Sequence, residues 1–217
     1  RRFTLTKEDL ALINPNTRTC PIFNSRRDAE LTRKLYRAAP VLVNEETGEN
    51  PWSVSFLRMF DMANDSHLFH TQNELEAQGF VLEGNRFTRE EEVFLPLYEA
   101  KMMHQFEHRH GTYEGRPTEE VRHGYCRDLS ETKCSNPRVL SQPRYWVESH
   151  EVESRAGGCI GNRRWLIGFR DVTRAVDKRT AQFAVLPWVG VGHTVSLTFL
   201  DSTLSAKHVC AFVADFN

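Results

Sequence analysis

The apolar residues of this chain lie in short runs separated by turn residues, and this pattern constrains the fold more than any other feature. The runs 93–98, 165–169, 182–186 and 189–200 are rich in β-branched and aromatic residues, which is typical of strands. Residues 80–88 contain two further apolar runs around Glu-Gly-Asn, which predicts a hairpin. Together with helical segments, these strands predict an α+β fold with a mixed, mostly antiparallel sheet and flanking helices.

Helical segments are indicated by capping residues and by apolar spacing. Thr6 is a suitable N-cap for a short helix over 7–13, which Pro15 follows. A second helix is expected from Ser25 or Asp28 to Tyr36, with leucines at helical spacing. Further helices are predicted over 65–79, 148–156 and 202–216, and further strands over 53–60 and 145–147.

Two segments are predicted to lack regular structure. Residues 111–142 are polar and rich in Gly, Pro, Asn and Ser, which predicts a long surface insert, in part disordered. Residues 157–161 form a glycine cluster that no strand precedes, so a loop is expected there. We treat 1–217 as one domain, and the absence of an initiator Met suggests a piece of a longer protein.

Composition narrows the class of protein. The chain has 28 Lys and Arg against 29 Asp and Glu, and 40% of its residues are hydrophobic, as in ordinary globular proteins. It has no apolar run of membrane-spanning length and no signal-peptide pattern, so a cytoplasmic protein without a membrane partner is expected. Its five cysteines are irregularly spaced, and free thiols are predicted.

Charge is distributed unevenly along the chain. Residues 1–40 hold nine Lys and Arg against four acids, and residues 155–180 hold seven against two. Between these blocks, residues 41–100 hold three Arg against twelve acids. If folding brings the two basic blocks together, they form one positive face, but charge that merely varies along a solvated surface would give the same counts.

The sequence lacks the motifs of several common enzyme classes. There is no phosphate-binding glycine loop, no GxSxG elbow and no HExxH. His123, Cys126 and Cys134 lack the paired spacing and the fourth ligand of a zinc site. Glu99-Ala100-Lys101 follows an apolar strand, as in Mg²⁺-dependent nucleases, with Asp61 or Asp65 as a second carboxylate.

Four polar clusters carry side chains suited to nucleic acid. The four clusters are the Asn-rich turn 14–19 and the segments 101–109, 144–146 and 170–180. In 144–146 an Arg precedes two aromatic residues, and 170–180 includes Thr180. Arg, Asn and Gln can contact base edges and phosphates. Trp146 and Phe169 are expected in the core, and Asp171 can pair with a neighbouring Arg. The candidate DNA-contacting residues are Asn14, Asn16, Thr17, Arg18, Lys101, His104, Gln105, Arg109, Arg144, Arg170, Arg174 and Arg179.

Six segments also carry a family resemblance. They are INPNTRTCPIF (13–23), RRDAELTRKLY (26–36), NPWSVSFLRMFDMANDSHLF (50–69), LPLYEAKMMHQFEHR (95–109), PRYWV (143–147) and FRDVTRAVDKRTAQFAVLP (169–187). They resemble the region downstream of the catalytic domain in large adenine-specific DNA methyltransferases of bacterial restriction–modification and phage-defence systems.

The resemblance implies a target-recognition domain that reads double-stranded DNA. An upstream methyltransferase domain of the same protein would bind S-adenosylmethionine and flip the adenine. Here Asn50-Pro51-Trp52 lacks the second Pro of that family's Asn-Pro-Pro-aromatic motif, and no cofactor loop is present, so no cofactor or methyl transfer is expected in this chain. Lys101, His104 and Arg109 are the residues that the resemblance places toward DNA. A nuclease using Glu99 and Lys101, or a protein-interaction module of a defence complex, are the alternatives.

Overall fold

The computed structural model describes residues 3–161, 163–174, 179 and 181–215 of the 217. The fold is α+β, with mostly antiparallel sheets and one parallel strand pair, as the sequence predicts. The chain divides into two compact units, Arg1–Val54 and Ser55–Asn217. In the described part of the chain, no helix combines the length and the apolar character that crossing a membrane requires.

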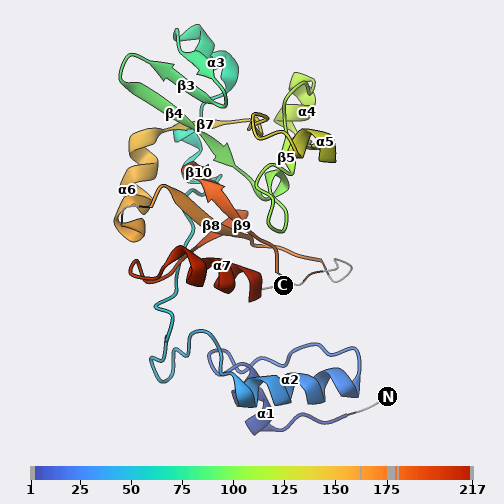
Figure 1. Ribbon diagram of the computed structural model, residues 1–217. Coiled ribbons are helices and arrows are strands. Elements are labelled where there is room, and N and C mark those ends of the chain that lie inside the picture. Colours follow the sequence, from blue (N-terminus) through green and yellow to red (C-terminus); the bar gives the residue numbers. More distant parts are fainter. Residues whose placement is uncertain (1–2, 162, 175–178, 180, 216–217) are drawn as a thin grey trace. The chain divides into compact units, whose positions relative to one another are not determined.

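The first unit is built on two helices, α1 (Lys7–Ile13) and α2 (Arg26–Ala38), drawn in blue in Figure 1. The N-cap Thr6 accepts a hydrogen bond from the Asp9 amide, and the Asp9 carboxylate accepts one from the Thr6 amide. This reciprocal capping fixes the start of α1. Arg33 of α2 lies 3.0 Å from the buried Asp9 carboxylate and joins the two helices.

Four antiparallel strands form one sheet of the second unit, in the order β1-β11-β8-β9. Phe169 on β8 faces Phe183 on β9, and these two rings stack with centroids 5.0 Å apart. Phe56 of β1 meets Phe169 edge-on, so aromatic rings connect three strands of this sheet. The strands are β1 (Ser55–Leu57), β8 (Trp165–Arg170), β9 (Phe183–Pro187) and β11 (Val195–Phe199).

The second sheet is centred on β4, whose residues 94–98 are all buried. It has the order β10-β4-β3-β2, and β7 also pairs with β4. The hairpin predicted at 80–88 is confirmed, with Gly84 at a φ of +68° in its turn. The strands are β2 (Val81–Glu83), β3 (Arg86–Arg89), β4 (Glu92–Tyr98), β7 (Trp146–Glu148) and β10 (Gly190–Val191).

The segment 111–142 is folded, so the prediction of a partly disordered insert is wrong. Gly111, Thr112 and Tyr113 are buried, and the Tyr113 amide donates to the Gln142 carbonyl at the far end of the segment. Short elements with their own caps fill the space between these ends. They are β5 (Gly111–Thr112), α4 (Thr118–Arg122), β6 (Arg127–Asp128) and α5 (Glu131–Cys134).

The remaining helices surround the sheets. They are η1 (Ser66–Leu68), α3 (Gln72–Ala77), η2 (Ala100–Met102), α6 (Ser149–Ile160) and α7 (Ala206–Asp215). The loop predicted over 157–161 is wrong, because α6 continues to Ile160 and only Gly161, at a φ of +58°, lies beyond it. The run 189–200 contains two strands instead of one, and the strand predicted over 53–60 covers only three residues. Trp146 is buried, as predicted, and Phe169 is half-buried.

Candidate nucleic-acid interface

The Asn-rich turn of the first unit uses most of its polar groups internally. Asn14 donates to Thr19 Oγ1 over 2.6 Å, and Thr17 Oγ1 lies 3.0 Å from the same atom. Asn16 donates to the Val43 carbonyl and accepts from the Glu45 amide, both over 2.9 Å. These bonds hold the turn against residues 43–45, so Asn14, Asn16 and Thr17 have a structural role in the folded unit.

Arg18, at a φ of +52°, lies on the exposed side of this turn. One of its terminal nitrogens is 2.9 Å and 3.0 Å from the two carboxylate oxygens of Glu46. An exposed ion pair of this kind is weak, so a phosphate can displace Glu46 at little cost. Arg18 belongs to the first unit and Lys101 to the second, and their expected convergence on one face stays a prediction.

Two predicted residues of the second unit, Glu99 and Arg144, form a buried ion pair, and Lys101 lies exposed beside it. The Arg144 guanidinium contacts both Glu99 oxygens, at 2.7 Å and 3.2 Å, and Tyr113 donates to Glu99 over 3.3 Å. Lys101 donates to the Gly124 carbonyl over 2.5 Å. Glu99 is only 6% exposed, and burial together with its charge raises the pKa of the Tyr113 hydroxyl.

This network leaves Glu99 poorly placed to act as a metal ligand. Both of its oxygens already accept hydrogen bonds from Arg144, and one also accepts from Tyr113. Among the residues that the structure describes, no group of three or more His, Cys, Asp or Glu side chains could hold a metal ion. The nuclease alternative therefore has no support from the geometry around Glu99 and Lys101.

Arg109 is similarly occupied. Its terminal nitrogens donate to the carbonyls of Cys134 and Asn136, over 2.6 Å and 2.9 Å, and its Nε lies 3.4 Å from Glu107. The side chain is largely buried. Arg109 thus holds the end of α5 and the following loop against the rest of the unit, a role that the sequence did not indicate.

The turn 104–107 has a different character. It closes through two hydrogen bonds, from the His104 amide to the Glu107 carbonyl and from the Glu107 amide to the His104 carbonyl, at 2.8 Å and 3.0 Å. Phe106, at the tip, has a φ of +61° and is 58% exposed. Left-handed backbone is strained for a bulky residue, and such strain is found where function requires it.

This turn is fastened to the start of β9, at the end of the pair where the chain passes from Arg170 of β8 to Phe183 of β9. The Phe106 amide donates to the Phe183 carbonyl, and the Phe183 amide donates to Gln105 Oε1, both over 2.8 Å. Arg170 and Gln182 pair across the end of the strands, and Arg170 donates to Gln182 Oε1 over 2.8 Å. Gln105 thus bonds to the edge of β9 that faces away from β8, and it holds the turn 104–107 against that edge.

Basic side chains gather beside this turn. The His110 and His104 rings are tilted by 40° with centroids 4.9 Å apart, and His110 Nε2 lies 3.5 Å from the Asp128 carboxylate. Burial lowers the pKa of His104 first, and the positive charges of His110, Arg170 and Arg179 lower it further, while Asp128 opposes them. We call His104, His110, Arg170 and Arg179 the His104 cluster. A phosphate placed here would meet several cations at once and would favour protonation of His104.

Two polar atoms at the same place are incompletely satisfied. Gln105 Nε2 and Arg170 Nε are buried, and neither finds a hydrogen-bond partner among the described residues. Buried donors without partners cost stability. This end of the sheet is therefore not arranged for stability alone, which is typical of functional sites.

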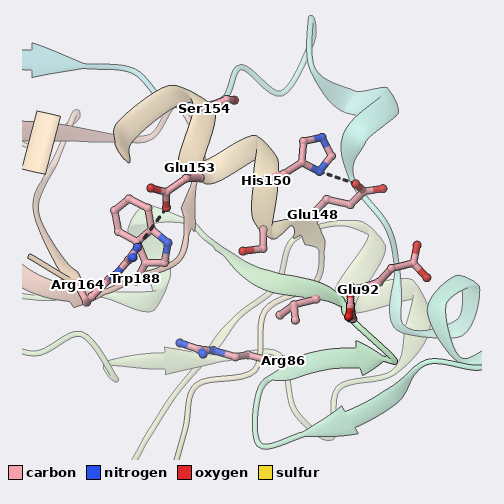
Figure 2. Close-up of a pocket in the computed structure, with 11 residues that line it drawn as sticks. Arg86, Glu92, Glu148, His150, Glu153, Ser154, Arg164 and Trp188 are labelled. Carbon is pink, nitrogen blue, oxygen red and sulfur yellow. Dashed lines mark hydrogen bonds and ion pairs between the residues drawn. The ribbon is translucent and has the colours of Figure 1, made fainter. Parts of the chain in front are cut away.

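A large hollow elsewhere in the unit has the wrong charge for DNA. This space of about 1,110 Å³ lies between the β3–β4 hairpin and α6, and Figure 2 shows the side chains that line it. Its visible ion pairs join His150 to Glu148, over 2.7 Å, and Arg164 to Glu153, over 3.2 Å, beside Trp188. Glu91 and Glu92 add further negative charge, so phosphates would be repelled from this hollow.

The structure thus divides the predicted residues of the second unit. It brings His104, Gln105, Arg170 and Arg179 together and uses Lys101, Arg109 and Arg144 in internal contacts. Arg174 is exposed in the connection after β8, and Thr180 lies outside the described residues. Asp171 pairs with Arg58 over 3.5 Å. Phe106 was missed as an individual residue, because no Gly or Asn marks its turn.

Comparisons with known proteins give no further constraint on this interface. No family model, no curated protein and no solved structure matches the chain.

Proposed function

We propose that this chain is a target-recognition module that binds double-stranded DNA through the His104 cluster and the turn 104–107. The observation that carries the proposal is the position of this turn. Two hydrogen bonds with Phe183 fix it beside Arg170 and Arg179, where the chain passes from β8 to β9. Cations that hold the backbone, next to side chains that can reach base edges, are what sequence-specific DNA binding requires.

The resemblance of six segments to adenine-specific DNA methyltransferases supports the same function. Two of those segments, 95–109 and 169–187, supply the turn and the arginines of the His104 cluster. In the proposed arrangement, an upstream methyltransferase domain binds S-adenosylmethionine and modifies adenine, while this chain selects the sequence. The chain itself neither binds the cofactor nor transfers a methyl group.

The test is a titration of labelled duplex DNA with the 217-residue chain. Fluorescence anisotropy measures the binding affinity at several salt concentrations. Phosphate contacts release counterions, so the affinity should fall steeply as salt rises. Arg179→Gln should weaken binding evenly across sequences and reduce the salt slope by about one. The matched control is Arg89→Gln, since Arg89 is an exposed arginine on β3 that pairs with Glu92.

Two outcomes would overturn the proposal. One is the absence of duplex binding at low salt. The other is an equal loss of affinity in Arg179→Gln and Arg89→Gln, which would indicate a nonspecific effect of net charge. Sequence reading is tested separately by selecting the chain's preferred duplexes from a random pool, where an enriched sequence is expected.

A further inference from the structure

Phe106 combines an exposed ring with a backbone conformation that is unusual for a bulky residue. Its φ of +61° is a conformation that Gly adopts freely and that strains a residue with a Cβ. The ring is also 58% exposed, so it gains little from burial in the fold. A Gly would serve this turn better if the turn were only a connection.

Several hydrogen bonds hold the turn beneath Phe106. The turn closes through the paired hydrogen bonds between His104 and Glu107, and the Phe106 amide itself is fastened to Phe183. Phe183 in turn stacks on Phe169 in the sheet. An exposed apolar side chain on a turn that is fastened to a sheet is the arrangement of a wedge.

The surroundings of the ring identify the partner by its chemistry. His104, in the same turn, lies within the electrostatic influence of His110, Arg170 and Arg179. Arg170 is bonded to Gln182, the neighbour of the Phe183 that anchors the Phe106 amide, so positive charge lies beside the turn. The polyanionic backbone of a nucleic acid complements this charge, and its stacked bases offer the apolar planes that a phenyl ring fits.

We infer that Phe106 is a wedge that inserts between two base pairs of the bound duplex, while the His104 cluster holds the flanking phosphates. This inference rests on the proposed DNA binding and adds a defined action to it. Insertion unstacks one base step and bends the duplex. Pyrimidine–purine steps such as TpA unstack most easily and are the expected place of insertion.

The experiment uses a short duplex with the fluorescent adenine analogue 2-aminopurine at a central TpA step. Its fluorescence rises when the base loses its stacking neighbours. The wild-type chain should raise this signal on binding, and Phe106→Trp should raise it too. Phe106→Gly should lose the signal and bind about tenfold more weakly, the size expected from losing one aromatic contact with a base.

Phe106→Gly also separates binding from folding. Because Gly accepts the left-handed turn, its thermal midpoint should equal or exceed that of the wild type. Tyr125→Ala is the matched control, since Tyr125 is another exposed aromatic, at 61%, outside the His104 cluster. That variant should keep both the affinity and the fluorescence signal.

The outcomes distinguish this inference from the proposed function. If the wild-type chain does not bind the duplex at low salt, the proposed DNA binding itself fails. If it binds, but the 2-aminopurine signal stays flat and Phe106→Gly binds equally well, the wedge is wrong and the DNA interface stands. Equal losses in Phe106→Gly and Tyr125→Ala would also contradict the wedge.

Discussion

The Glu99–Arg144 network and the His104 cluster both draw on the segment 99–110, and they use arginines from later in the chain in opposite ways. In the first, the Arg144 guanidinium is matched by a buried carboxylate, so its charge is neutralised within the fold. In the second, burial lowers the pKa of His104 first, and the charges of His110, Arg170 and Arg179 lower it further against Asp128. The difference teaches that an Arg beside aromatic residues is by itself a weak indication of a DNA surface, because the fold can place a buried carboxylate against it.

The largest effect is expected from breaking the buried pair. Arg144→Met leaves Glu99 buried without its partner, and the free energy of unfolding should fall by about 3–5 kcal/mol. A urea titration, monitored by tryptophan fluorescence, measures this change in the free energy of unfolding. The double variant Glu99→Gln with Arg144→Met removes the unpaired charge and should recover a large part of the loss.

A contrary result for Arg144 would change the comparison. If Arg144→Met kept its stability and bound DNA more weakly, Arg144 would be a DNA contact and the network would belong to the interface. The same measurement therefore tests the earlier prediction that Arg144 contacts DNA.

The second prediction concerns Arg109, which joins α5 to the rest of the unit. Arg109→Met keeps the apolar stem and removes the hydrogen bonds to Cys134 and Asn136. Hydrogen bonds to charged groups contribute about 1.5–3 kcal/mol, so a loss in this range is expected. Hydrogen exchange should show faster opening confined to 131–139, with DNA affinity retained; lost affinity without local opening would refute the structural role.

Local signals explain which elements the sequence could predict. The helix at 7–13 was predicted with its correct bounds because Thr6 and Asp9 are neighbours in the chain and cap it on their own. The glycine cluster at 157–161 was misjudged because Val152, Ala156 and Ile160 form a buried face that carries α6 through Gly157 and Gly158. Burial of that face outweighs the low helix propensity of Gly.

The site was predictable in composition and not in detail. Clusters of Arg, Gln and His drew attention to 101–109 and 170–180, and the structure joins parts of both. The sequence could not show that Arg144 meets Glu99, because 45 residues separate them. It could not distinguish Gln105, which accepts a bond from Phe183, from a residue that reads bases.

Gln105 therefore gives the third prediction. Gln105→Ala leaves the Phe183 amide without its acceptor and should lower the free energy of unfolding by about 1–2 kcal/mol. The turn 104–107 would lose one of its two attachments to β9, so DNA affinity should fall for all duplexes alike. Binding to a panel of duplexes measures this, and a change at one base position only would restore Gln105 as a base-reading residue.

The smallest effect is the pH dependence contributed by His104. Its pKa is lowered in the free protein, mainly by burial and then by His110, Arg170 and Arg179, so the ring is neutral at pH 7. For stability the sign is fixed: the neutral ring is accommodated above the unfolded pKa of about 6.5, and this contribution is lost as pH falls below it. DNA binding has the opposite sign, because phosphates favour the charged ring and binding takes up a proton. Duplex affinity should therefore rise as pH falls below 7, by at most about tenfold for each unit by which binding raises the pKa. Anisotropy titrations at several pH values, limited to conditions where circular dichroism shows a folded chain, measure how the affinity depends on pH.

His104→Gln should flatten this pH dependence, whereas His67→Gln, at an exposed histidine in η1, should leave it unchanged. A pH dependence that persists in His104→Gln would show that another group takes up the proton.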